Sequence, residues 1–233
     1  MNILAMDTSN QILGVALLQD EQLIGSITTN IKKNHSIRLM PAINQLMHEV
    51  AMTPAELDKI VVAKGPGSYT GVRIGLTTAK SMAWSLDIPV VGISSLEALA
   101  WQGHFYDSYI CPFFDARRGL VFTGMYQTKN NKLELSGEEK NVLMEDWLKE
   151  LAESREEVLF LSPDITKHED LIRTHLGDRA IIPEGPFHMA DPSHLAFAGL
   201  HTQPDSTYGL TPNYLRLAEA EANWLKKEQR KNG

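Results

Sequence analysis

A loop with three glycines and one proline constrains the fold of this chain more than any other feature. It consists of Gly65-Pro66-Gly67-Ser68-Tyr69-Thr70-Gly71, follows the apolar run 60–63 and precedes a long helical pattern. Glycine and proline at this density favour a tight turn with accessible backbone. Between a strand and a helix, such a turn can present N–H groups to an anion. A strand-to-helix turn without a ligand explains the glycines equally well.

The loop departs from two common phosphate-binding motifs. A P-loop requires Lys and then Ser or Thr after its last glycine, whereas Val72 and Arg73 follow Gly71. The dinucleotide fingerprint places two residues before its third glycine, whereas three residues separate Gly67 from Gly71. We therefore expect neither P-loop nor Rossmann chemistry.

Composition narrows the class of protein. The chain has 233 residues, 43% of them hydrophobic, which is typical of one large folded domain or two small ones. Its net charge of -7 argues against binding nucleic acid unaided. Cys111 is the single cysteine, which excludes an intrachain disulfide and fits a reducing compartment. No apolar run approaches the ~20 residues of a membrane span, and the N-terminus lacks signal-peptide features. We expect a cytoplasmic protein with no membrane association.

Apolar periodicity predicts an α/β protein in two blocks. In the first block we expect strands at 3–6, 12–18, 23–29, 60–63 and 90–93, and helices at 36–50, 70–86 and 94–101. In the second we expect strands at 109–114, 120–126, 158–161 and 180–182, and helices at 144–154, 167–176 and 192–201. The predicted subdomains are 1–103 and 104–216, with a C-terminal helix at 217–230 packing back on the first.

Several short motifs together resemble one family. They are Asp7-Thr8-Ser9 on an early turn, the glycine loop continued to Gly75, His35-Ser36, the segment 91–98, Asp115-Ala116-Arg117 and the segment 212–216. Over nearly the whole chain they resemble the bacterial TsaB family, also called YeaZ. The resemblance implies an actin/Hsp70-like (ASKHA) fold of two tandem subdomains, each a mixed central sheet flanked by helices.

The resemblance also implies a function in tRNA modification. TsaB proteins are non-catalytic partners of TsaD, the transferase that forms threonylcarbamoyladenosine next to the anticodon of tRNAs reading codons that start with A. The ATPase TsaE completes the set, and tRNA is expected to bind only through the complex. A homodimer through the same helices is a candidate assembly when TsaD is absent.

The residues argue against independent catalysis. TsaD carries metal-binding histidines in a segment where this chain has Ser95 and Leu99, and neither suits a metal. No two of the eight histidines are four residues apart, so no zincin motif exists. We expect no catalytic residue and no metal. The alternative is an autonomous actin-like ATPase or phosphotransferase, which would need an adenosine-binding glycine pair, and the chain contains no Gly-Gly.

Two sets of site residues follow from these patterns. The nucleotide- or anion-binding candidates are Asp7, Thr8, Ser9, Gly65, Gly67, Ser68 and Gly71. No tightly bound cofactor is expected, and ATP or ADP is a candidate ligand at the interface with TsaD and TsaE. The partner-interface candidates are His35, Leu39, Ile43, Leu46, Arg73, Gly75, Leu76, Ala79, Lys80 and Ala83. Small residues every four positions from Gly71 to Ala83 allow a close helix contact, with a partner or with this protein's own sheet.

Overall fold

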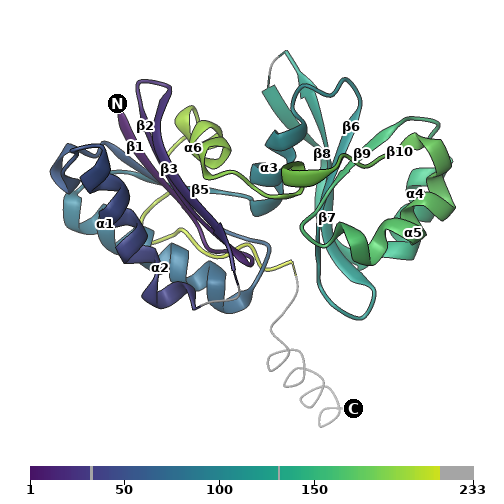
Figure 1. Cartoon of the computed structure of the whole chain (residues 1–233), viewed down its shortest axis with the longest axis horizontal. Coiled ribbons are helices and arrows are strands. Elements are labelled where there is room, and N and C mark those ends of the chain that lie inside the picture. The colour runs from purple at the N-terminus through teal and green to yellow at the C-terminus, as the bar shows by residue number, and fades with distance from the viewer. Residues whose placement is uncertain (32–33, 131, 216–233) are drawn as a thin grey trace, which may run out of the picture.

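Two five-stranded sheets lie next to each other, each covered by helices (Figure 1). The computed structural model describes residues 1–31, 34–130 and 132–215. The strand orders are β3-β2-β1-β4-β5 and β10-β9-β6-β7-β8. We call each sheet with its helices a lobe. Both sheets mix parallel and antiparallel pairs, which confirms the predicted fold class.

The first sheet is buried on both faces except along its edge strand β3, whose residues are exposed or half-buried. Its strands are β1 (Asn2–Asp7), β2 (Ile12–Gln19), β3 (Gln22–Asn30), β4 (Lys59–Ala63) and β5 (Val90–Ile93). Side chains alternate between faces along each strand. Leu4 and Met6 therefore join one core cluster, and Ile3 and Ala5 join another on the opposite face.

Three helices cover these two faces. The helices α1 (Leu39–Glu49) and α2 (Tyr69–Leu86) pack on one side, and α6 (Pro192–Leu200) packs on the other. Ser68 caps α2, since its side chain accepts a hydrogen bond from Gly71 N. The helix ends at Asp87, which adopts a left-handed conformation.

The second lobe has the same plan. Its strands are β6 (Tyr109–Asp115), β7 (Leu120–Lys129), β8 (Lys132–Leu143), β9 (Val158–Leu161) and β10 (Ala180–Ile181). The helices α4 (Met144–Glu153) and α5 (Ile165–Leu176) cover one face. The short helix α3 (Ser95–Ala100) covers the other face and lies between the lobes (Figure 1). Single 3-10 turns occur at His35–Ile37, Pro54–Glu56, Trp101–Gly103, Gly177–Arg179 and Gly185–His188.

Two features differ from the sequence prediction. The strand β8 was not predicted, because charged residues interrupt its apolar alternation and it lies at the sheet edge, where most of its side chains are exposed. The assignment of 104–216 to one C-terminal subdomain is wrong in its last part. The helix α6 buries Leu195 and Ala196 against the first sheet, not the second. The predicted helix at 217–230 lies outside the described residues.

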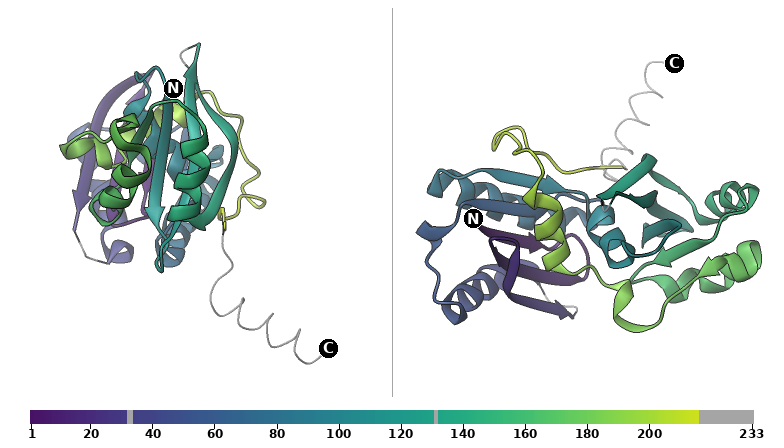
Figure 2. Two further views of the ribbon diagram at one scale, coloured as in Figure 1. Left: turned by 90° about the vertical axis from the view of Figure 1, so that its right-hand side faces the viewer. Right: turned by 90° about the horizontal axis from the view of Figure 1, so that it is seen from above.

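The segment after α6, residues 203–214, stays with the first lobe, and we call it the strap. Asp205 N donates to Val90 O at 2.9 Å, and Asn213 N donates to Lys64 O at 2.7 Å. Figure 2 shows the strap in yellow-green, running along the first lobe toward the second. It covers the edge strand β5, which removes an open sheet edge. Among the described residues, no helix combines the length and apolar character needed to cross a membrane.

Candidate functional site: the cleft between the lobes

The two predicted anion-binding segments lie against each other at one edge of the first sheet. They meet because β1 and β4 are parallel neighbours, so the turns that follow them share an edge. Ser68 N donates to Ser9 O at 2.6 Å, and Thr8 Oγ1 donates to Gly71 O at 2.7 Å. A Cβ at Gly71 would lie 2.1 Å from Thr8 O, and one at Gly67 would lie 2.2 Å from Ser9 O. These two glycines are therefore needed for direct backbone contact between the turns.

Asp7, Thr8 and Ser9 are inside the protein. Their exposed fractions are 5%, 1% and 0%. Asp7 Oδ1 accepts a hydrogen bond from Ser9 N at 2.7 Å, so the carboxylate closes its own turn. Burial raises the pKa of Asp7, and the hydrogen bonds from Ser9 oppose that rise. The expectation that these three residues present polar groups to a ligand is therefore wrong for the described conformation, and the buried Gly65 and Gly71 also serve packing.

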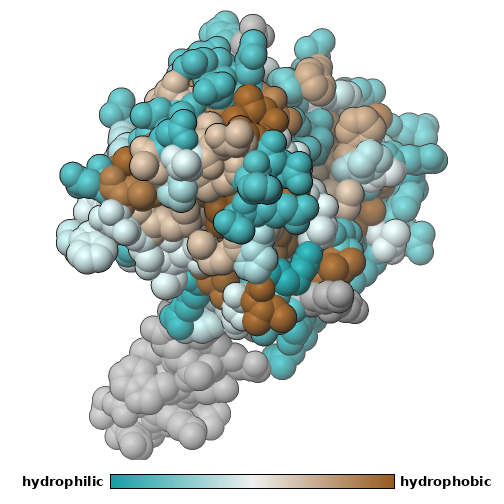
Figure 3. All heavy atoms as spheres, turned by 60° about the vertical axis from the view of Figure 1, so that its left-hand side comes forward, coloured by the Kyte–Doolittle hydropathy of each residue, from teal (hydrophilic) through white to brown (hydrophobic). Residues whose placement is uncertain are grey.

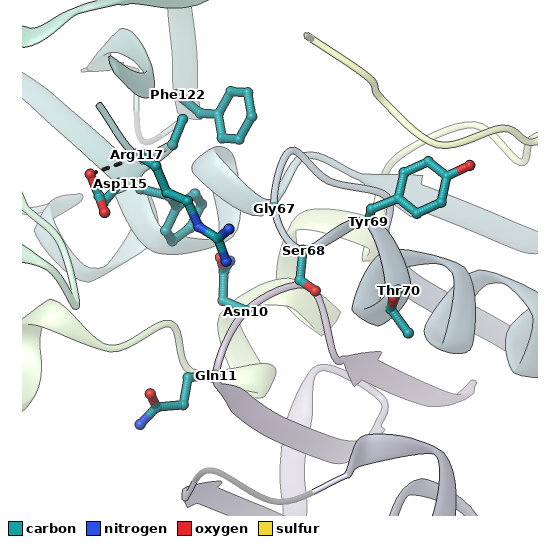
Figure 4. A pocket seen from close by; sticks show the side chains of 11 residues that line it. Asn10, Gln11, Gly67, Ser68, Tyr69, Thr70, Asp115, Arg117 and Phe122 are labelled. Atoms are coloured by element: carbon teal, nitrogen blue, oxygen red, sulfur yellow. Dashed lines mark hydrogen bonds between the residues drawn. The ribbon is translucent and has the colours of Figure 1, made fainter. Parts of the chain in front are cut away.

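A cleft of about 560 Å³ lies between the lobes beside this junction. Of the nucleotide candidates, only Gly67 and Ser68 line it. The other lining residues are Asn10, Gln11, Tyr69 and Thr70 from the first lobe and Phe114, Asp115, Ala116, Arg117 and Phe122 from the second. Figure 4 shows the Arg117 side chain extending into the cleft from the second lobe. The N-terminus of α2 and one guanidinium therefore reach the same space, an arrangement that suits an anion.

Asp115 is the acidic residue of the second lobe at this cleft, and it is already paired. Its Oδ2 accepts from Lys167 Nζ at 3.1 Å, and its Oδ1 lies 3.4 Å from His168 Nε2. Burial alone would raise the pKa of Asp115, but Lys167, His168 and the Arg117 N–H together outweigh it, so the pKa lies below the ordinary value. The ion-pair partners of Asp115 thus come from α5 and not from its own turn. Across the described part of the chain, no three His, Cys, Asp or Glu side chains gather as a metal site would require.

His35 has a structural contact. Its Nε2 lies 2.7 Å from Asn10 O, which joins the turn before α1 to the turn after β1. The contact of His35, a predicted partner-interface residue, is thus with this chain's own backbone.

The comparisons with known proteins identify the family. Residues 21–224 match the model of the family described as TsaD, tRNA N6-adenosine threonylcarbamoyltransferase. A Bacillus subtilis (strain 168) protein, named tRNA threonylcarbamoyladenosine biosynthesis protein TsaB, is 51% identical over 229 residues, which cover 98% of this chain and 100% of that protein. The chain belongs to the TsaB family.

Solved structures support the fold. The structure of YeaZ from Pseudomonas aeruginosa has a TM-score of 0.77 at 24% identity and covers 92% of this chain and 99% of its own. An inorganic polyphosphate/ATP-glucomannokinase from Arthrobacter has a TM-score of 0.50 at 12% identity and covers 86% of this chain and 99% of its own. The two-lobed architecture of this TsaB-family chain is thus the actin-like fold shared with sugar kinases.

Most of the predicted partner-interface residues are buried in this chain's own core. Leu39, Ile43, Leu46, Leu76, Ala79 and Ala83 are 0–4% exposed and pack against the first sheet, and Gly75 is buried with them. A Cβ at Gly75 would lie 2.8 Å from Thr8 Oγ1 and 3.4 Å from Val62 Cγ2. The small-residue ribbon therefore serves close packing on the TsaB-family chain's own sheet, and its assignment to a partner is wrong.

Arg73 and Lys80 point away from that core but have intramolecular contacts. Arg73 Nε donates to Tyr214 Oη at 2.7 Å, and its guanidinium carbon lies 3.8 Å from the centre of the Tyr69 ring. Lys80 Nζ donates to Leu210 O at 2.9 Å. Both side chains thus connect α2 to the strap, Lys80 at Leu210 and Arg73 at Tyr214.

The outward face of α1 and α2 is a surface that the sequence reasoning missed. A shallow groove of about 370 Å³ is lined by Met40, Thr77, Thr78, Ser81, Met82 and Ser85. Met40 is 49% exposed, and Ile37, which precedes α1, and Trp84 of α2 are 71% and 69% exposed. Figure 3 views the molecule from the side of α1 and shows hydrophobic patches among polar surface. The 3.6-residue helical period could have located this face, because it lies on the side of each helix opposite the buried apolar residues.

Proposed function

We propose that this chain is the non-catalytic partner of a TsaD-type transferase in the formation of threonylcarbamoyladenosine in tRNA. The observation that carries the proposal is its 51% identity across 98% of the chain to a protein named for that biosynthesis. The contacts of the two aspartates near the cleft support the proposal that the chain is non-catalytic. Asp7 closes its own turn and Asp115 pairs with Lys167, so neither carboxylate is free to hold a metal or activate a nucleophile.

We place the TsaD contact on the outward face of α1 and α2. The groove there has small residues along α2 and flexible methionines on both sides, which suits the close approach of a partner helix. The same face is our candidate for a homodimer when the partner is absent. The acidic chain has a net charge of -7, so tRNA would depend on TsaD, TsaE or their joint surface for cationic contacts.

Nucleotide is a further candidate ligand. ATP or ADP would place its phosphates at the N-terminus of α2, near Ser68 and the Arg117 guanidinium, with TsaD and TsaE closing the site. We propose weak binding to the isolated chain, since Lys167 is already engaged and Arg117 is the cation that extends into the cleft.

A reconstitution tests the proposal. Unmodified tRNA is incubated with threonine, bicarbonate, ATP, the adenylate-forming synthase, TsaD and TsaE, with and without this chain, and nucleosides are measured by mass spectrometry. The modified nucleoside should form only when the chain is present. Equal modification in both reactions would refute the function. ATP hydrolysis by the isolated chain, lost in Asp115→Asn, would instead favour an autonomous ATPase or phosphotransferase.

The contact surface has its own test. Met40→Asp and Ser81→Arg place charge in the groove and should weaken TsaD binding at least tenfold in calorimetry. His201→Arg is the matched control, because His201 is exposed at the end of α6 on the opposite face of the first sheet. If all three variants bind TsaD equally, the partner uses another surface.

A further inference from the structure

A second cavity between the lobes holds a cluster of polar groups that the proposed function does not use. It has a volume of about 390 Å³ and shares no lining residue with the cleft described above. Its polar lining includes Lys64, Ser94, Glu97, Tyr126, Glu139 and Asn213. These residues come from both lobes, from α3 and from the strap.

Glu139 of β8 connects three of these segments. Its Oε1 accepts a hydrogen bond from Tyr126 Oη at 2.6 Å and another from Ser94 Oγ, and its Oε2 accepts from Asn213 Nδ2 at 2.7 Å. Tyr126 belongs to the second lobe, whereas Ser94 follows β5 and Asn213 lies on the strap that holds to the first lobe. One carboxylate thus joins the two lobes. We call Glu139 with these three donors the clasp.

Glu97 of α3 lies beside the clasp without a partner of its own. Within the described residues its carboxylate has no hydrogen bond or ion pair, although it lines the same cavity. Burial and, to a smaller extent, the Glu139 carboxylate raise the pKa of Glu97 to about 7, and Lys64 opposes that rise. A carboxyl in this setting changes its charge near neutral pH.

Three other charged or titratable groups, Lys64, Tyr126 and Asp205, lie in or around the clasp. Lys64 follows β4 and supplies the one cation of the described cavity lining. Burial raises the pKa of Tyr126 well above its ordinary value, so its hydroxyl keeps its proton and goes on donating to Glu139. Asp205 on the strap accepts from Gly92 N at 2.8 Å and shares a neighbouring cavity with Lys64. The carboxylates of Glu97 and Glu139 therefore form the like-charged pair of the site.

We propose that the clasp is a proton-controlled latch between the lobes. A proton on Glu97 leaves Glu139 as the single charge beside its three donors, and the lobes stay joined. Loss of that proton to solvent places a second negative charge next to Glu139, and the repulsion weakens the bonds to Ser94 and Asn213. The lobes then separate at the side of the strap, which alters the spacing between Gly67 and Arg117 across the cleft.

The test is a distance measurement between the lobes at two pH values. Gln45→Cys on α1 and Asp170→Cys on α5 provide exposed labelling positions, while the native Cys111 is fully buried. Energy transfer between two pH-insensitive dyes is recorded at pH 5.5 and pH 8.5. We expect the distance to increase at the higher pH with a midpoint near neutrality. An identical distance at both values would overturn the proposal.

Three variants identify the group responsible. Glu97→Gln should stay at the short distance at both pH values, and circular dichroism at each pH establishes that it is folded. Glu139→Gln should abolish the pH-dependent change in distance, because no charge remains at position 139 to repel the Glu97 carboxylate. Glu138→Gln is the matched control, since Glu138 is an exposed neighbour on the same strand, and it should behave as the wild type. A full transition in Glu97→Gln would overturn the assignment.

Discussion

Replacing Gly71 with alanine tests whether the contact between the two turns decides the geometry of the cleft. On an isolated helix the change would stabilise by about 1 kcal/mol, because glycine is a poor helix former. Here the new Cβ would lie 2.1 Å from Thr8 O, a backbone atom that cannot move without its strand. Overpacking of this kind costs about 1–3 kcal/mol. Separating the turns also breaks the 2.7 Å bond from Thr8 Oγ1 to Gly71 O, worth about 1 kcal/mol.

The balance is a loss of about 2 kcal/mol in the free energy of unfolding, measured by urea denaturation. For a chain of this size it corresponds to a melting temperature lower by roughly 4–8 °C. Ser81→Ala is the control, because Ser81 is exposed on the same helix, and it should change the free energy by less than about 0.5 kcal/mol.

Gly75→Ala provides a comparison in which the new Cβ meets a side-chain atom of Thr8 and not its backbone carbonyl. Its Cβ would meet Thr8 Oγ1 at 2.8 Å, so the second change Thr8→Ala should relieve the clash. The same second change should not relieve Gly71→Ala, because the obstacle there is the Thr8 carbonyl. If Gly71→Ala is as stable as the wild type, or if Thr8→Ala rescues it, our account of the glycine loop is refuted.

Three further predictions concern buried polar groups. Lys59 Nζ donates to Gly199 O and Leu200 O at the end of α6, so Lys59→Met should lower the free energy of unfolding by about 1–3 kcal/mol in urea titration, and an unchanged value would contradict that role. Burial raises the pKa of the Cys111 thiol to about 11, so iodoacetamide at pH 8 should modify it within minutes in guanidinium but hardly at all in the folded protein. The pKa of Glu97 is raised from 4.5 to about 7, so the stability that this group contributes is full below pH 4.5 and is lost as pH rises through 7. Glu97→Gln should therefore gain up to about 3 kcal/mol over the wild type between pH 4 and pH 8 in paired urea titrations, and parallel pH profiles would contradict the shift.

The sequence predicted elements better than it predicted what they contact. The helix predicted at 36–50 is present as α1, and its Leu39, Ile43 and Leu46 are buried. Hydrophobic periodicity reports that a face is covered, but not whether the cover is the chain's own sheet or a partner. The same limit applies to α6, whose apolar composition fits either lobe equally well. Its position is set by Gly199, where a Cβ would lie 2.4 Å from Val61 Cγ2 of the first sheet.

The edge strand β8 was missed for a different reason. Its sequence Lys132–Leu143 carries Glu134, Glu138, Glu139 and Lys140, and one face of the strand is open to solvent. Charges on an edge strand are a protection against aggregation, but they remove the apolar alternation that marks a strand in sequence. As a result, no sequence pattern indicated that Glu139 lies on a strand or joins the two lobes.

The aspartates of the two acidic turns are both engaged in contacts within the chain. Both turns lie where the lobes face each other, and each retains its aspartate. Asp7 is 5% exposed and bonded to Ser9 N, so exposing it would require the turn to unfold against the glycine loop. Asp115 would have to leave the Lys167 ammonium. The carboxylates therefore stabilise the walls of the cleft, and a reaction there would first have to break these contacts.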